Sequence, residues 1–148
     1  MIIQALKIVL AESEIAAKLR DGLSAANQLK DVTFGLEPGT FKVGGKFQIG
    51  FSIPFETHWT ASVLEQGRRL GVRLSHVSVG MLGMSKTMAA SQIMGALSQK
   101  LQGVDGVAVE QDLIVLDPAV LLSAKGIHLD APVRRIDVLP GRVEIEVG

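Results

Sequence analysis

Hydrophobic residues alternate with small or polar ones along residues 41–55, which read FKVGGKFQIGFSIPF. A period of two is typical of a β-strand with one buried face. At about 3.3 Å per residue an unbroken strand of this length would reach roughly 50 Å, far beyond the usual strand. We therefore expect a long strand region that bends at Gly44, Gly45 or Gly50, where glycine lowers the cost of bending. The apolar side chains at its odd positions are Phe41, Val43, Phe47, Ile49, Phe51, Ile53 and Phe55.

The same periodicity predicts strands on both sides of this stretch. Residues 2–10 form a first strand, and residues 32–43 form a hairpin whose turn contains Pro38 and Gly39. Residues 69–80 change phase between Leu74 and Val77, which predicts a β-bulge near Ser75 or His76. Residues 106–117 indicate a strand pair or one bent strand. Residues 131–148 form a closing hairpin that turns at Pro140-Gly141.

Helical spacing of apolar residues is confined to three segments. Residues 13–29 predict a short amphipathic helix capped by Ser13. Residues 85–103 predict the longest helix, which carries a wide apolar face and ends at Gly103. A short helix follows Asp117, with proline at its first position. This order predicts one α+β domain over residues 1–148, in which a long, strongly curved antiparallel sheet wraps around one long amphipathic helix, with one or two shorter helices beside it.

Composition narrows the classes of function. The chain has 148 residues, 47% of them hydrophobic and 20% charged, which is enough for a sizeable core. Fifteen basic residues balance fifteen acidic ones, so we expect no nucleic-acid partner. The chain has no cysteine, which excludes disulfides, zinc–thiolate sites and thiol catalysis.

No apolar run approaches the roughly 20 residues needed to cross a bilayer, so no membrane span is expected. The first residues, MIIQALKIVLAESE, lack the basic region of a secretory signal. This favours a cytoplasmic location. If a signal peptide had been removed from the chain, the expected location would be the cell envelope.

The order of several motifs resembles a known family. LAESEIAAKL precedes a GTFKVGGKF hairpin, GVRLSHVSVGMLGM precedes the long helix, and GIHLDAPVRRIDVLPGRVEIEVG closes the chain. The chain thereby resembles the bacterial phospholipid-binding family associated with mycobacterial lipomannan elongation, which is related to the tubular lipid-binding superfamily. The resemblance implies a long helix embraced by a curved sheet and non-catalytic binding of a lipid or fatty-acyl ligand. Members of that family are usually exported or membrane-anchored, whereas this sequence shows no export signal.

The residues also support an acyl-chain site between the sheet and the long helix. Methionine side chains are flexible and polarizable, so they can repack around an apolar chain. Arg134 and Arg135 are candidates for contact with a lipid phosphate. The other candidate ligand-binding residues are Phe47, Phe51, Ile53, Met84, Met88, Met94, Leu97 and Leu101. The alternative is that the same side chains fill an ordinary hydrophobic core.

The sequence gives less support to a phosphate-binding loop, a metal site or a catalytic site. Residues 80–87, GMLGMSKT, approach a phosphate-binding loop and are followed by the strand LIVLD, but Ser85 stands where the second glycine is needed. Ser85 as a helix cap is the alternative. His58, His76 and His128 lie in separate segments without ligand spacing, so no metal site is expected. No catalytic triad is assembled by spacing, and no cofactor or enzymatic activity is expected.

Two hypotheses of function remain. In the first, the protein is a non-catalytic binder of a lipid or other hydrophobic ligand in a trough between curved sheet and helix, with peripheral membrane contact. In the second, it is a structural or assembly module with a dry core that forms a homodimer through open sheet edges.

Overall fold

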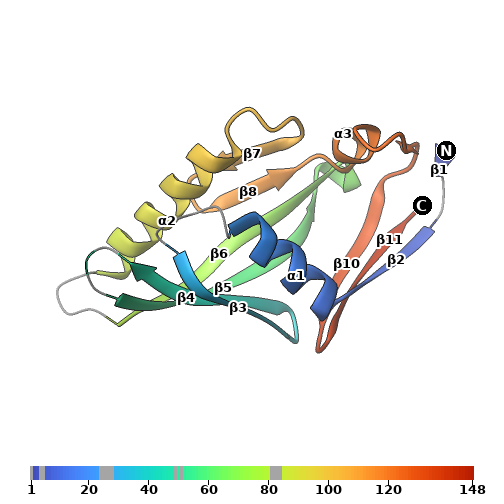
Figure 1. Cartoon of the computed structure of the whole chain (residues 1–148). Coiled ribbons are helices and arrows are strands. Elements are labelled where there is room, and N and C mark those ends of the chain that lie inside the picture. The colour runs from blue at the N-terminus through green and yellow to red at the C-terminus, as the bar shows by residue number, and fades with distance from the viewer. Residues whose placement is uncertain (1, 4–5, 24–28, 49, 51, 81–84) are drawn as a thin grey trace.

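The computed structural model describes the chain except for residues 1, 4–5, 24–28, 49, 51 and 81–84 (Figure 1). The fold is α+β and mostly antiparallel, as the order of elements predicted. Its helices are α1 (Glu12–Leu23), α2 (Lys86–Leu101) and α3 (Pro118–Ser123), with a 3-10 turn η1 (Glu65–Gly67). Its strands are β1 (Ile2–Ile3), β2 (Leu6–Ala11), β3 (Leu29–Glu37), β4 (Thr40–Gln48), β5 (Ser52–Leu64), β6 (Arg69–Val79), β7 (Val107–Glu110), β8 (Leu113–Leu116), β9 (His128–Leu129), β10 (Val133–Leu139) and β11 (Arg142–Val147).

Two antiparallel sheets carry most of the fold. The larger sheet has six strands in the order β3-β4-β5-β6-β8-β7, and the smaller has three in the order β10-β11-β2. The two-residue strands β1 and β9 form a separate parallel pair. The expected hairpins at Pro38-Gly39 and Pro140-Gly141 are both present, with Gly39 at φ 73° and Gly141 at φ 81°. Residues 107–116 form the strand pair, not one bent strand.

Residues 41–55 are not one long strand, so that expectation is wrong. Strand β4 ends at Gln48, β5 begins at Ser52, and Gly50 between them has φ 85°. The two arms pair antiparallel, with Phe47 opposite Ile53 and Phe41 opposite Trp59. Odd residues therefore oppose odd residues, and the apolar stripe continues across both strands on one face of the sheet.

The predicted β-bulge in residues 69–80 is confirmed at Ser75. His58 faces His76, whereas the next residue, Trp59, faces Leu74. Ser75 is thus the extra residue, and its hydroxyl donates to the carbonyl oxygen of His58 at 3.0 Å. A bulge of this kind changes which side chains share a face. Here it brings Val77 onto the same face as Leu74.

That apolar face of the large sheet is covered by two different layers. Trp59, Ala61 and Val63 alternate along β5, so all three point to the same side. Trp59 packs in a cluster with Met94 of α2. Ala61 and Val63 pack instead in the clusters of the three-stranded sheet, the first with Val138 and Val143 and the second with Val133 and Val147. Figure 1 shows α2 and the strands β10 and β11 lying toward opposite ends of the large sheet.

Local sequence signals account for most helix ends. Ser85 caps α2 by accepting the backbone N–H of Met88 at 3.1 Å, and Asp117 caps α3 by accepting that of Val120 at 3.3 Å. Gly103 has φ 82° just after α2. The predicted cap at Ser13 is wrong because α1 begins one residue earlier, where the backbone N–H of Glu12 donates to the carbonyl of Gly141 at 2.9 Å. The first predicted strand is two strands, β1 and β2, around the undescribed residues 4–5.

Candidate functional site

The candidate site lies between α2 and the apolar face of the six-stranded sheet. Ala89 and Met94 of α2 are buried, and Ile93 and Leu97 are half-buried beside them. Their spacing of three to four residues places them on one side of the helix. The sheet contributes three buried side chains to the same cluster, Trp59, Leu74 and Val77. Half-buried side chains from the strands surround this cluster, namely Phe41, Val43, Val72, Val79, Val109 and Ile114.

One chain of hydrogen bonds satisfies the polar atoms of this apolar region. The indole N–H of Trp59 donates to the hydroxyl of Thr57 at 2.8 Å. That hydroxyl donates in turn to the carbonyl oxygen of Val43 at 2.7 Å. Thr57 is 2% exposed and Trp59 is 6% exposed, so both bonds are shielded from water. Phe41 stacks beside Trp59, with ring centroids 6.4 Å apart. Trp59 is thereby held in one orientation at the floor of the candidate site.

The predicted ligand-binding residues on α2 are placed differently from one another. Met94 is only 6% exposed in the cluster, and Leu97 and Leu101 are half-buried. Met88 is 51% exposed and is absent from the residues packed there. Met84 lies outside the described residues.

On the sheet, Phe47 and Ile53 are brought together and Phe51 lies outside the described residues. Phe47 and Ile53 are opposite each other on β4 and β5. Ile53 is 3% exposed, and Phe47 stacks on Phe55 with ring centroids 4.5 Å apart. These three side chains continue the stripe beyond the residues that pack directly with α2. The apolar stripe therefore extends past the cluster at α2, and Ile53 in this extension is buried as well.

Two hollows in the described part of the surface lie away from α2. The first, of about 530 Å³, lies over the glycine pair of β4 and is lined by Asp31, Thr33, Phe34, Gly35, Lys42, Gly44, Gly45, Lys46, Phe55 and Glu56. The second, of about 710 Å³, surrounds η1 and is lined by Glu65, Gln66, Gly67, Arg68, Arg69, Asp117, Ala119, Leu129, Asp130, Ala131 and Pro132. Neither of these two hollows includes a residue of α2. Under α2, Met94 packs instead against Trp59, Leu74 and Val77.

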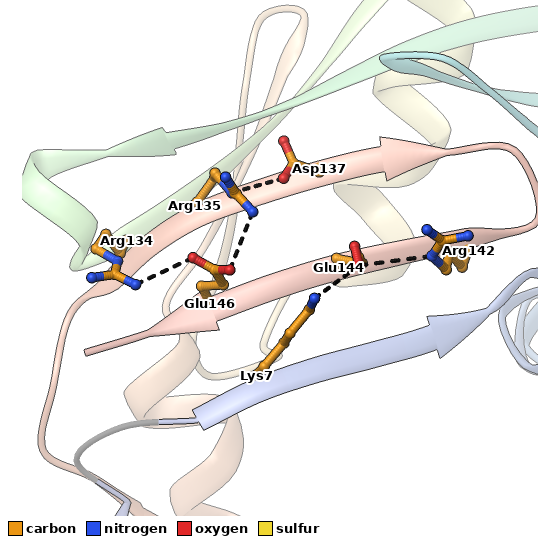
Figure 2. A network of polar contacts seen from close by, with 7 residues as sticks. All are labelled: Lys7, Arg134, Arg135, Asp137, Arg142, Glu144 and Glu146. Atoms are coloured by element: carbon orange, nitrogen blue, oxygen red, sulfur yellow. Dashed lines mark hydrogen bonds and ion pairs between the residues drawn. The ribbon is translucent and has the colours of Figure 1, made fainter.

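Arg134 and Arg135 lie in a network of ion pairs on the outer face of the three-stranded sheet (Figure 2). Arg134 contacts Glu146 at 3.3 Å, while Arg135 contacts Glu146 at 3.1 Å and Asp137 at 2.8 Å. The face that carries these side chains is opposite the one that packs on the large sheet. The structure therefore does not bring these arginines together with the residues under α2.

The same network extends along β11 to Glu144. Its carboxylate contacts Lys7 at 3.0 Å and Arg142 at 3.7 Å. The hydrogen bond from Lys7 lowers the pKa of Glu144 below its ordinary value, and the nearby positive charges add to this effect. This face is accordingly a set of paired charges rather than a free cationic patch.

The segments that suggested a phosphate-binding loop have other roles where they are described. Ser85 caps α2, and the carboxylate of Asp117 caps α3. Strand β8, which ends just before Asp117, pairs antiparallel with both of its neighbours. Residues 81–84, the centre of the motif, lie outside the described residues.

One group on the polar face of the large sheet was missed by sequence reasoning. The imidazoles of His58 and His76 face each other across β5 and β6, with ring centroids 5.3 Å apart at 76°. Glu56 is 3.2 Å from Nε2 of His58, and this hydrogen bond lowers the pKa of the Glu56 carboxyl. The signal that could have revealed this pair is the change of phase in the apolar pattern at Ser75. The β-bulge there decides which residue stands opposite His58.

Within the described ranges, no group of three or more His, Cys, Asp or Glu side chains is arranged to hold a metal ion. None of the helices described there is long and apolar enough to cross a membrane. No family model, curated protein or solved structure matches this chain.

Proposed function

We propose that this protein binds the acyl chain of a lipid, or a similarly elongated hydrophobic ligand, between α2 and the six-stranded sheet, without catalysis. The observation that carries the proposal is the continuous apolar face of that sheet. It runs from Phe47 and Ile53 past Trp59 to Leu74, and the cluster at α2 includes part of it. An apolar face of this length matches an elongated apolar ligand, which would lie along it beside α2.

The shape of the sheet supports the same proposal. Side chains from β4, β5, β6, β7 and β8 all belong to the cluster at α2. Five strands at about 4.8 Å spacing span roughly 19 Å, whereas a helix with its side chains is about 10–12 Å wide. The main contacts of α2 are with β6 and β7, and side chains of β4, β5 and β8 can join the same cluster when the sheet curves toward the helix. We infer that the sheet arches over α2 as a trough.

The chemistry of the helix face also suits an apolar ligand. Met94 is the buried methionine of α2 and can change rotamer at low cost, since it is unbranched at Cβ. Ala89 and Ala90 beside it leave little side-chain volume between helix and sheet. A small shift of α2 would therefore admit an acyl chain between the helix and the sheet without removing large side chains from the core.

A second candidate function, a structural module with a dry core, is favoured by one specific observation. The space beneath α2 is filled by Trp59, Leu74, Val77 and Met94. In this reading the open edge of β2, which carries the 52% exposed Val9, pairs with a second copy of the chain.

Trp59 separates the two functions because it is the single tryptophan of the chain and lies at the floor of the site. Dibromostearate quenches an indole only on close contact, whereas stearate of the same length does not. If an acyl chain lies beside Trp59, the brominated acid quenches its fluorescence in a saturable titration and stearate competes. Unchanged fluorescence at saturating dibromostearate, together with a mass free of lipid after extraction, would exclude the acyl-chain proposal.

A matched pair of variants locates the ligand. Ala89→Phe adds a ring on the buried side of α2 and is expected to reduce the quenching. Met88→Phe adds a similar ring at a position that is 51% exposed and should leave the quenching unchanged. Equal quenching in both variants would show that the acid binds elsewhere. Circular dichroism of each variant checks that it is folded.

A further inference from the structure

We propose that His58 and His76 form a binding site for a divalent transition-metal ion of the zinc type on the polar face of the six-stranded sheet. The proposal is independent of the acyl-chain site, because these imidazoles point away from the face that carries Trp59. It depends on the β-bulge at Ser75, which places His76 instead of Ser75 opposite His58.

The separation of the two rings fits one shared ion. Their centroids are 5.3 Å apart and their planes are inclined by 76°. Two imidazoles on one tetrahedral zinc ion, with Zn–N bonds of about 2.0–2.1 Å, have ring centroids about 5 Å apart. An ion shared by the two rings therefore requires little change in the separation of their centroids. Water reaches the remaining coordination positions because His76 is exposed.

The neighbouring carboxylate prepares His58 for this role. Glu56 Oε1 lies 3.2 Å from Nε2 of His58, and this contact favours the tautomer that has its proton on Nε2 and leaves Nδ1 for the metal ion. A histidine that donates its other ring N–H to a carboxylate is the usual arrangement in metal sites, since the carboxylate fixes the tautomer and orients the ring. Glu56 is thus a positioning residue.

The surrounding charge does not oppose a cation. Lys42 stands opposite His58 on β4, and its ammonium group is 3.5 Å from Glu56 and 2.8 Å from Glu37. One positive charge therefore faces two carboxylates. Lys42, Glu37 and Glu56 together carry a net negative charge.

Calorimetric titration of the full chain with Zn²⁺ at pH 7.5 tests the site. We expect one ion per chain, with affinity reduced about tenfold or more in both His58→Gln and His76→Gln, because one imidazole alone is a poor ligand set. His128→Gln removes the third histidine, which lies in β9, and should bind Zn²⁺ like the wild type.

The double variant His58→Gln/His76→Gln adds a sharper criterion. If the two rings share one ion, each single change already breaks the chelate, and the double variant is no weaker than either single one by more than about twofold. Additive losses would indicate two separate sites and overturn the proposal. Wild-type affinity in either single variant would overturn it as well. The imidazole ¹⁵N resonances of His58 and His76, and not those of His128, should shift when Zn²⁺ is added.

Discussion

Thr57 accepts the indole N–H of Trp59 at 2.8 Å, two positions away on the same strand and on the same face of the sheet. Trp59 belongs to the apolar cluster at α2, and the hydroxyl of Thr57 donates a hydrogen bond of its own to the carbonyl oxygen of Val43. A tryptophan can therefore be buried under α2 without leaving its N–H unpaired.

Thr57→Val should destabilise the fold by about 1–3 kcal/mol, because it leaves the buried N–H of Trp59 without an acceptor. Urea unfolding followed by the fluorescence of Trp59 measures the change in free energy. Thr57→Ser is the control, since it keeps the hydroxyl and loses one methyl group. If the valine and serine variants had equal free energies of unfolding, the hydrogen bond would make no net contribution to stability.

Met94→Ala should lower the free energy of unfolding by about 2–5 kcal/mol if its side chain fills a packed core. Met88→Ala, on the same helix but 51% exposed, should change it by no more than about 0.5 kcal/mol. Thermal or urea unfolding of both variants gives the comparison. A loss at Met94 as small as that at Met88 would indicate loose packing under α2.

Gly67→Ala should be strongly destabilising, on the order of 3 kcal/mol or more, for two reasons. Gly67 has φ 93°, and an added Cβ would lie 2.3 Å from the carbonyl oxygen of Val133. Gly95→Ala is the matched control: no atom lies within 4 Å of the added Cβ in the middle of α2. That change should stabilise the fold by about 0.5–1 kcal/mol, since alanine is the better helix former. Differential scanning calorimetry measures both, and equal melting temperatures would contradict the packing of η1 against β10.

Lys7→Gln should raise the pKa of Glu144, since the hydrogen bond from Lys7 is the main cause of its lowered value. A carboxyl whose pKa is lower in the folded than in the unfolded state stabilises the fold above the unfolded value. That contribution is lost as the pH falls through the folded pKa. The variant and the wild type should therefore differ in stability at neutral pH and converge in acid.

Carboxyl ¹³C titration of Glu144 measures this shift directly. Lys46→Gln is the control, because Lys46 pairs with Asp31 at 3.6 Å and does not touch Glu144. An unchanged midpoint for Glu144 in Lys7→Gln would show that the ion pair in Figure 2 does not form in solution.

Local signals in the sequence were sufficient to predict the turns, the main helix and the β-bulge. Pro38-Gly39 and Ser85 act through their own backbone neighbours, so their effect can be read without knowledge of the fold. The bulge at Ser75 could be predicted because it shifts the phase of apolar residues within one strand.

The reversal at Gly50 could not be distinguished from a bend, for a physical reason. In the antiparallel pairing of β4 and β5, odd residues face odd residues, so alternation continues through the turn as it would in one strand. Periodicity alone carries no sign of the reversal. The glycine itself was identified, but its φ of 85° follows from the pairing.

The layer formed by β2, β10 and β11 also escaped sequence reasoning, because strand order is set by packing over the whole fold rather than by nearby residues. The pairing of His58 with His76 was missed for another reason, since the register of β5 and β6 depends on which residue forms the bulge. The placement of Arg134 and Arg135 among carboxylates follows from the same layer.

The pairing of β2 with β11 has a consequence for the time course of folding. Residues 6–11 pair with residues 142–147, so roughly 130 residues must be enclosed before this ladder can form. Contacts between such distant segments slow folding, because the entropy of closing the loop is lost before the contacts compensate for it. The β4–β5 hairpin, by contrast, encloses only a short turn. Refolding should therefore show early protection of amides in β4 and β5 from hydrogen exchange, with those of β2 and β11 protected last.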